Sequence, residues 1–330
     1  KPRSSTTIQG CCQFESDLLQ IDYKESSMKI SYSRFSSYLR CPYRHYLGYY
    51  ECLRAKKPVR PLYFGTDFHK LLELRNDPEK LAEAQKAIGE QYYELKPQWQ
   101  EELGEDYLFE LQCIFSDYME IYKDAPQPTQ TERPFELEIC NVKGEPVIFN
   151  GVIDELYKYR HKGEKMCKLG EHKTFNRKPD QNVLIMNTQK NLYAKAVQMM
   201  TGVLPKSVIW DYIHSTPASM PIWLPKSNRF SKAKSNNITP FSWRRACELK
   251  GIKDIKVLQE GNDYAANVSN FFFRCELDIV PYMVENIWEG FVYTCRDIVR
   301  QGHKNKTKNM TPDCKFCSYR DICFTELTQG

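Results

Sequence analysis

The sequence predicts an α/β protein in which a small mixed β-sheet is flanked by helices, and three observations lead to this class. Residues 78–123 follow a helical pattern of apolar positions throughout. Residues 135–173 contain runs of apolar, β-branched and aromatic residues separated by turn residues, as in consecutive strands. A strand, a helix and another strand then follow up to residue 213, and this order is typical of a crossover connection.

The composition excludes several classes of protein. The chain of 330 residues has 41% apolar residues, which is enough to bury a substantial core and excludes wholesale disorder. We expect no contact with a membrane, because no run of eighteen apolar residues occurs. The odd number of 13 cysteines, and an N-terminus without an apolar stretch like a signal peptide, argue against a disulfide framework. We therefore expect a reducing, cytoplasmic location.

The net charge of +5 is unevenly distributed along the chain. Residues 71–125 contain 14 acidic and 5 basic residues, whereas residues 158–256 contain 20 basic and 6 acidic residues. This asymmetry predicts that the second half presents a positive surface, as a polyanion-binding protein does. Lysines that only keep the surface soluble are the alternative.

The first organised segment is expected after a tail or leader at residues 1–27. From Ile30 onward, Ser31 or Ser33 can cap a helix, and Pro42 should interrupt or restart it. Arginines interleave with aromatic residues here, a mixture that suits stacking on bases and binding of phosphates. An amphipathic helix that covers the core gives the same pattern.

A second helix is predicted directly after Gly65 and Thr66, and it places His69 and Glu73 on one face. A lone histidine on a helix is more often a surface or core residue than a ligand. His69 becomes a candidate imidazole ligand if the fold brings it to the strands that follow. A proline-marked linker at residues 125–134 leads to those strands.

The strands that follow form a predicted β-hairpin, with strands at residues 147–159 and 166–173 and a polar turn at residues 160–163. Asp154 lies midway along the first strand. An antiparallel return can bring Glu171 beside it, on the same face of the sheet.

The alternation of strand side chains also places Lys173 on the face of Glu171, and His172 on the opposite face. Two carboxylates suit a hard divalent cation such as Mg²⁺. The ammonium group of Lys173 can then orient or deprotonate an attacking water. A solvated strand face gives the same short pattern, so the hairpin alone does not establish a metal site.

A helix ending at Gly202 is expected after the hairpin, with Gln189 and Tyr193 on one face. The apolar run at residues 207–213 predicts a central strand. Residues 214–240 lack periodicity and are expected to form a long basic surface loop, in which Lys226, Arg229, Lys232 and Lys234 can close over a phosphate backbone.

Three cysteines lie within ten residues near the C-terminus: Cys314, Cys317 and Cys323. This spacing is typical of metal ligation, by tetrahedral zinc or by an iron–sulfur cluster. A fourth ligand is needed, and the closest upstream cysteine, Cys295, lies in a predicted amphipathic helix. A remote cysteine is therefore the better candidate for the fourth position.

The order of these motifs resembles that of RecB-like nucleases in the PD-(D/E)xK superfamily, such as AddB-type recombination nucleases, CRISPR-associated adaptation nucleases and phage recombination exonucleases. The matching residues run from Ile30 to Leu327 and include Cys41-Pro42-Tyr43, Gly65, His69, Glu73, Gly151, Asp154, Glu171, Lys173, Thr174, Gln189, Tyr193 and the three C-terminal cysteines. The resemblance implies a restriction-endonuclease-like core in one nuclease domain over residues 28–330. Its expected parts are a helical arm (28–134), the catalytic core (135–213), the basic loop (214–240), and helices with the cysteine cluster (241–330).

The resemblance also implies a role for each residue. The divalent-metal ligands would be His69, Asp154, Glu171 and the carbonyl of His172, with Lys173 positioning the water. Gln189 and Tyr193 would line the site and contact DNA. A 4Fe–4S cluster, with Zn²⁺ as the alternative, would be held by Cys41, Cys314, Cys317 and Cys323. Glu171 stands where most members have Asp, and Glu132 matches only loosely a glutamate that some members carry before the hairpin.

The resulting hypothesis is a Mg²⁺- or Mn²⁺-dependent DNA exonuclease that acts in recombination, repair or end processing. Its substrate would be single-stranded DNA or DNA with free ends, and its partner a helicase or a strand-annealing protein. It would act in the cytoplasm, or in the host cytoplasm if a phage encodes it. The alternatives are a catalytically inactive DNA-binding or scaffold subunit of a recombination complex, and a CRISPR-adaptation nuclease.

Overall fold

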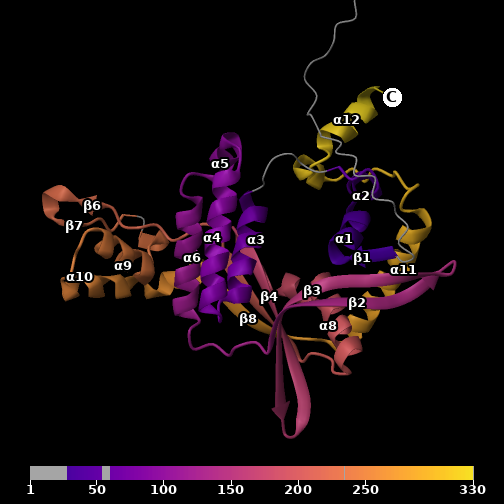
Figure 1. The fold of residues 1–330 in the computed structure, drawn as a ribbon, viewed down its shortest axis with the longest axis horizontal. Coiled ribbons are helices and arrows are strands. Elements are labelled where there is room, and N and C mark those ends of the chain that lie inside the picture. The colour runs from indigo at the N-terminus through magenta and orange to yellow at the C-terminus, as the bar shows by residue number, and fades with distance from the viewer. Residues whose placement is uncertain (1–27, 54–59, 234, 330) are drawn as a thin grey trace, which may run out of the picture. The chain divides into compact units, whose positions relative to one another are not determined.

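The computed structural model describes residues 28–53, 60–233 and 235–329 (Figure 1). The chain divides into two compact units. The first contains the described residues among 28–57, 135–151 and 286–329, and the second contains those among 58–134 and 152–285. The expected tail at residues 1–27 and the expected phosphate contact of Lys234 lie outside the described residues. The division into a single domain over residues 28–330 stays a prediction.

The strands are β1 (Met28–Ser31), β2 (Gln130–Val142), β3 (Glu145–His161), β4 (Glu164–Phe175), β5 (Ser207–His214), β6 (Trp223–Leu224), β7 (Arg229–Phe230) and β8 (Phe272–Asp278). The α-helices are α1 (Tyr32–Arg40), α2 (Pro42–Tyr49), α3 (Arg60–Leu74), α4 (Pro78–Glu94), α5 (Pro97–Leu103), α6 (Tyr107–Ile121), α7 (Gln181–Ile185), α8 (Thr188–Thr201), α9 (Pro240–Leu249), α10 (Ile255–Glu260), α11 (Pro281–Gln301) and α12 (Arg320–Gln329). None of the helices formed by described residues is long and apolar enough to cross a membrane.

The first unit begins with a strand and two short helices whose boundaries follow from capping. β1 runs parallel to the first part of β3, with Met28 opposite Val147. The hydroxyl of Ser31 accepts a hydrogen bond from the backbone N–H of Arg34 (3.2 Å), which caps α1. α2 then begins at Pro42, because proline fits the first turn of a helix, where no backbone donor is needed. The predicted cap and restart are both confirmed.

The sheet of the second unit has the order β3-β4-β5-β8. β3 and β4 are antiparallel, β4 and β5 are parallel, and β5 and β8 are antiparallel. α8 makes the crossover between the two parallel strands and ends at Gly202, which has a φ of 74°. The predicted mixed α/β class and the central place of residues 207–213 are therefore confirmed.

The helices of the second unit pack on this sheet through one apolar cluster. Side chains of α3, α4 and α6 meet Ile213 of β5 and Phe272 of β8 in this cluster. Phe68 of α3 contacts Phe115 of α6 edge-on, with ring centroids 6.1 Å apart. This packing fixes α3, which carries His69, relative to the strands.

Two boundaries differ from those expected. α3 begins at Arg60, so Gly65 and Thr66 lie inside the helix rather than before it. Arg60 forms an ion pair with Glu110 of α6, and this contact between distant segments is not visible in a local pattern. The hairpin turn contains only Lys162 and Gly163, whose φ values of 50° and 84° suit a tight two-residue turn.

The segment 214–240 is not one long loop. β6 and β7 pair within it, and Phe230 and Ile238 are buried. They pack with Trp243 of α9 in a small separate apolar cluster, in which the Phe230 and Trp243 rings lie 5.1 Å apart. These two apolar side chains are too widely spaced in the sequence to give a periodic signal.

Candidate active site

Three side chains of the β3–β4 hairpin share one face. Glu155 pairs with Gly170, and this register places Asp154 opposite Glu171. The Asp154 carboxylate accepts a hydrogen bond from the backbone N–H of His172 (Asp154 Oδ2 to N, 2.9 Å). Lys173 Nζ lies 2.5 Å from Glu171 Oε1. The structure thus brings together the two carboxylates and the ammonium group that the sequence places on one face.

Two further ligand-type side chains reach Asp154 from other elements. His69 of α3 has its Nδ1 atom 3.7 Å from Glu132 Oε1 and 3.9 Å from Asp154 Oδ2. Among the described residues, these three form a group whose possible ligand atoms all lie within 4.8 Å of one another. His69 was expected here, whereas Glu132 was only loosely matched by its sequence.

Glu132 has an unusual backbone for a residue in a strand. Its φ is 43°, in the left-handed region that residues with a side chain rarely adopt. Such strain persists where the surrounding structure requires it. In this backbone conformation, the carboxylate of Glu132 is directed toward His69.

A cavity of about 720 Å³ adjoins this group. It is lined by α3 and α4 and by the end of β4, and His69, Glu132 and Lys173 are among its lining residues. His69, Glu132 and Lys173 are therefore accessible to a large polar substrate.

The charges at the site perturb one another. Burial, and then the negative charge of Asp154, raise the pKa of Glu171. Burial lowers the pKa of Lys173, but Glu171 and Asp154 outweigh it and raise this pKa above its ordinary value. Lys173 is therefore a cation at neutral pH, paired with Glu171 and stabilised by the nearby charge of Asp154.

The side chain of Tyr193 of α8 lies close to Glu171. Burial and the nearby charge of Glu171 raise the pKa of Tyr193 to about 12, and Gln189 forms a hydrogen bond with Tyr193. The two residues predicted to line the site thus lie beside it.

The opposite face of the hairpin holds a buried network of charges. His172 Nε2 lies 3.0 Å from Glu155 Oε1, and His172 Nδ1 lies 3.2 Å from Asp211 Oδ2. Arg75 lies 2.7 Å from Glu155, and Arg274 lies 2.8 Å from Asp211. Burial lowers the pKa of His172, but Glu155 and Asp211 outweigh it and raise this pKa to about 10. The imidazole of His172 thus belongs to this network, and its backbone N–H holds Asp154.

The sequence did not indicate this network. Arg75 directly follows α3, and the other members come from β3, β4, β5 and β8, so the network joins segments up to about 200 residues apart. One signal is present: Glu155 stands in an otherwise apolar run, on the face opposite that of Asp154.

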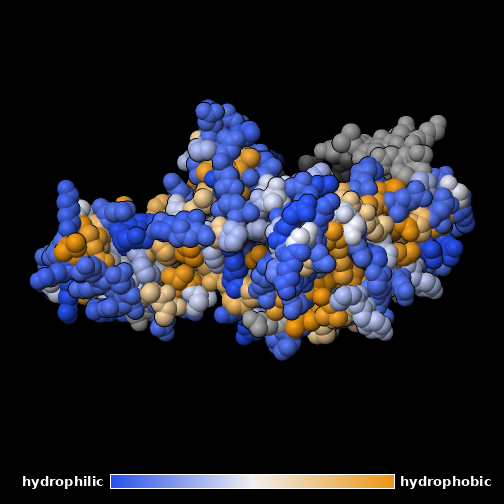
Figure 2. Space-filling model, turned by 90° about the horizontal axis from the view of Figure 1, so that it is seen from below, coloured by the Kyte–Doolittle hydropathy of each residue, from blue (hydrophilic) through white to orange (hydrophobic). Residues whose placement is uncertain are grey.

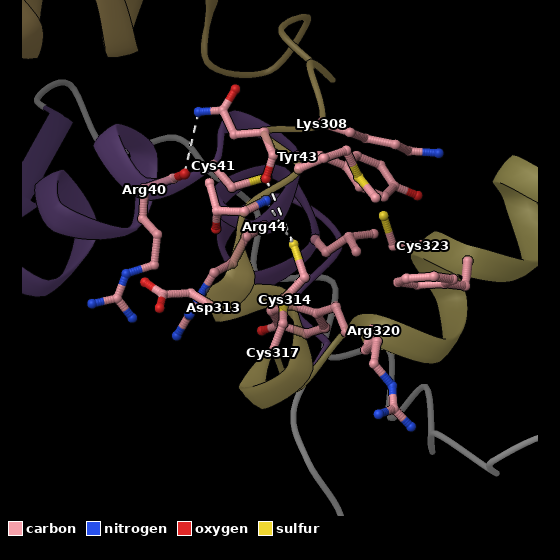
Figure 3. Close-up of a pocket in the computed structure, with 16 residues that line it drawn as sticks. Arg40, Cys41, Tyr43, Arg44, Lys308, Asp313, Cys314, Cys317, Arg320 and Cys323 are labelled. Carbon is pink, nitrogen blue, oxygen red and sulfur yellow. Dashed lines mark hydrogen bonds between the residues drawn. The ribbon is translucent and has the colours of Figure 1, made fainter.

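The four cysteines singled out from the sequence line one pocket in the first unit (Figure 3). Cys41 lies between α1 and α2, and the other three lie in or beside the 3-10 helix Pro312–Phe316 and α12. Burial raises the pKa of Cys323; the charge of Lys308 opposes this rise, and the other three thiols add to it. In the described part of the chain, these sulfurs are not among the groups whose ligand atoms all approach within 4.8 Å.

Comparisons with known proteins identify the family. The family model described as the PD-(D/E)XK nuclease superfamily matches residues 29–324, so the chain belongs to this superfamily. The mixed sheet flanked by helices is consistent with a restriction-endonuclease-like fold. No curated protein gives a significant match.

Solved structures also resemble the chain. A protein named "Putative exonuclease" from Eubacterium rectale has a TM-score of 0.50 and 9% identity, covering 97% of this chain and 100% of that one. The protein SSO0001 has a TM-score of 0.36 and 13% identity, covering 89% of this chain and 85% of that one. At 9% identity, the similarity to the Eubacterium rectale protein concerns the fold alone.

Proposed function

We propose that this member of the PD-(D/E)XK nuclease superfamily is a divalent-metal-dependent deoxyribonuclease with its active site at the open face of the β3–β4 hairpin. The observation that carries the proposal is the approach of His69, Glu132 and Asp154 to within 4.8 Å of one another, beside the Lys173–Glu171 pair. Superfamily members are nucleases, and the arrangement provides the groups that phosphodiester hydrolysis needs.

The donor set fits a cation such as Mg²⁺ or Mn²⁺. Carboxylate oxygens suit both ions, and a neutral imidazole is acceptable to Mn²⁺. The carboxylates of Asp154 and Glu171 lie opposite each other on adjacent strands, and a bound cation would relieve their repulsion. When bound, such a cation supplies Lewis-acid chemistry at a phosphodiester.

The residues of the chain have separate tasks in this proposal. Asp154 is held in place by the backbone N–H of His172. Lys173, charged and next to Glu171, orients the attacking water toward the phosphorus and offsets the growing negative charge. Tyr193 of α8 lies near Glu171 and interacts with Gln189, and in this proposal the two residues contact the DNA.

The choice of DNA, and of free ends as the point of attack, rests on the motif order shared with RecB-like nucleases and on the basic residues of the second half. The name "Putative exonuclease" of a protein with a similar fold agrees with attack at free ends. A role in recombination, repair or end processing, with a helicase or a strand-annealing protein as partner, follows from the same resemblance.

We also propose that Cys41, Cys314, Cys317 and Cys323 hold a 4Fe–4S cluster. The four thiols line a single pocket although they come from opposite ends of the described chain. The choice of an iron–sulfur cluster over tetrahedral zinc rests on the resemblance of the motif order to RecB-like nucleases. Joining residues so distant in the chain would restrict the unfolded state.

The nuclease is tested by digestion of end-labelled single- and double-stranded DNA in Mg²⁺, in Mn²⁺ and in EDTA. We expect cleavage only with a metal, and none by the Asp154→Asn variant. Metal binding, followed by calorimetry with Mn²⁺, should weaken in the same variant. Wild-type protein that binds DNA without cleaving it in either metal would instead indicate a scaffold subunit.

The cluster is tested by the absorption spectrum of anaerobically purified protein. We expect a broad band near 400 nm, a general property of iron–sulfur chromophores, which the Cys317→Ala variant should lose. A colourless protein that contains one zinc ion would contradict the cluster.

A further inference from the structure

The β3–β4 hairpin continues beyond the sheet as a two-stranded ribbon. β3 and β4 pair as far as His161 and Glu164, whereas β5 pairs with β4 only from Leu169 onward. We call residues 158–167 the β3–β4 arm. In Figure 1 the arm projects from the sheet of the second unit, on the side away from α3, α4 and α6.

The arm is basic, and its charges are not neutralised. It contains Lys158, Arg160, Lys162 and Lys165 but only one acidic residue, Glu164. All four basic side chains are exposed, and no salt bridge within 4.0 Å involves any of them in the part of the chain that the structure describes. Lys168, just beyond the arm, is instead paired with Glu276 at 2.9 Å. Figure 2, which is seen from the direction of the tip, shows hydrophilic residues over this part of the surface.

The placement of two of these charges is unfavourable for folding. Arg160 lies directly opposite Lys165 in the register of the two strands. Like charges at such positions destabilise a hairpin, by about 0.2–1 kcal/mol. A ribbon of two strands gains little stability by itself. The folded state does not benefit from this charge pattern, which suits an anionic partner instead.

The arm and the active site share a face. Because side chains alternate along a strand, Lys158, Arg160 and Lys165 lie on the same face as Asp154 and Glu171. Six residues separate Asp154 from Arg160, which corresponds to about 20 Å along the strand. The three basic side chains line a cavity of about 420 Å³ next to Thr201 and Val203, at the end of α8.

We propose that the β3–β4 arm binds the phosphodiester backbone of the nucleic acid about 20 Å from the point of cleavage, or about six nucleotides away in a stacked strand. The proposal rests on the proposed function and adds a second contact with the substrate. The contact is independent of sequence, since lysine and arginine at these positions recognise phosphate charge. It anchors the substrate and takes no part in the chemistry.

The test compares two triple variants that remove the same charge. Lys158→Ala, Arg160→Ala and Lys165→Ala are combined in one protein. Lys80→Ala, Lys86→Ala and Lys123→Ala, all exposed lysines of the second unit, are combined in the control. Cleavage is measured on end-labelled DNA of about 4 and about 30 nucleotides. Binding of the longer DNA is measured by fluorescence anisotropy in EDTA over a salt series, and thermal melting checks that each protein is folded.

On the longer DNA, we expect the arm variant to have a KM about tenfold higher at unchanged kcat, while the control matches the wild type. The slope of log affinity against log salt should fall by about 3 in the arm variant. DNA of about four nucleotides cannot span the distance, so all three proteins should cleave it equally.

An unchanged KM and salt slope on the longer DNA would overturn the proposal, as would an equal loss at both lengths. If the wild type cleaves neither DNA, the proposed function fails, and the salt series alone decides the role of the arm.

Discussion

The two faces of the β3–β4 hairpin carry similar residues with opposite roles. On one face, Asp154 and Glu171 lie beside each other, and Lys173 is the nearest cation. On the other, Glu155 lies between Arg75 and His172, and Asp211 lies between His172 and Arg274. Asp154 and Glu155 are adjacent in the sequence, and only the alternation of the strand separates their environments.

The difference shows in the pKa values of the carboxylates. Burial raises the pKa of Glu171, and the charge of Asp154 raises it further. Burial acts in the same direction on Glu155, but the charges of His172 and Arg75 outweigh it and hold the pKa below its ordinary value. A buried carboxylate that is matched by cations stabilises the fold, whereas carboxylates that face each other are available to bind a cation.

The largest effect is expected on the open face. Lys173→Ala removes the group that orients the water and should lower kcat by about 10²–10⁴-fold while DNA binding persists. Digestion of end-labelled DNA in Mg²⁺, with binding followed in EDTA, measures both quantities. Cleavage at the wild-type rate in this variant would contradict the assignment.

The next largest effect is expected on the paired face. Asp211→Asn leaves Arg274 without its carboxylate and His172 with Glu155 alone, and it should lower the free energy of unfolding by about 3–5 kcal/mol. Urea denaturation measures the change. Glu136→Gln, which removes the exposed ion pair with Lys29, is the control and should change it by less than about 1 kcal/mol.

A smaller loss is expected from closing the space above Glu155. A Cβ atom at Gly170 would lie 2.7 Å from Glu155 Oε2 and 2.9 Å from Glu155 Cβ. Gly170→Ala should therefore destabilise the protein by about 1–3 kcal/mol. Gly89→Ala in α4, where the new Cβ meets nothing within 4 Å, should instead stabilise it by about 0.5–1 kcal/mol. Equal denaturation midpoints for the two variants would contradict this prediction and would show that the strands shift at Gly170 to accommodate the added Cβ atom.

The smallest effect concerns pH and the metal-free protein. The pKa of Glu171 is raised above its ordinary value of 4.5, so ionisation of this residue disfavours the folded state. This loss of stability is absent below pH 4.5, and it is complete above the pKa that Glu171 has in the folded protein. Glu171→Gln should therefore melt at the same temperature as the wild type in acid and at a higher temperature at pH 7, in EDTA. If Glu171→Gln melted at a lower temperature than the wild type at pH 7, ionised Glu171 would stabilise the folded state, which contradicts the prediction.

The part of the site that lies in the hairpin could be predicted from the sequence, because strand alternation is a local property. It places Asp154, Glu171 and Lys173 on one face, and the register of β3 and β4 agrees. The cap of α1 at Ser31 and the end of α8 at Gly202 were predictable for the same reason.

Features that depend on distant contacts could not be predicted in this way. The pairing of Arg60 in α3 with Glu110 in α6 joins distant segments, and the ion-pair partners of His172 come from two other strands, β3 and β5. Glu132 reaches His69 through a backbone conformation that its residue type does not favour.

The contrast between the two faces is tested most directly by making the same substitution on each, Glu171→Gln and Glu155→Gln, and measuring DNA cleavage and thermal melting of both. We predict that Glu171→Gln abolishes cleavage and melts no lower than the wild type at pH 7 in EDTA. Glu155→Gln should melt markedly lower and still cleave DNA at temperatures where it remains folded. Loss of cleavage in both variants with equal melting temperatures would contradict the account.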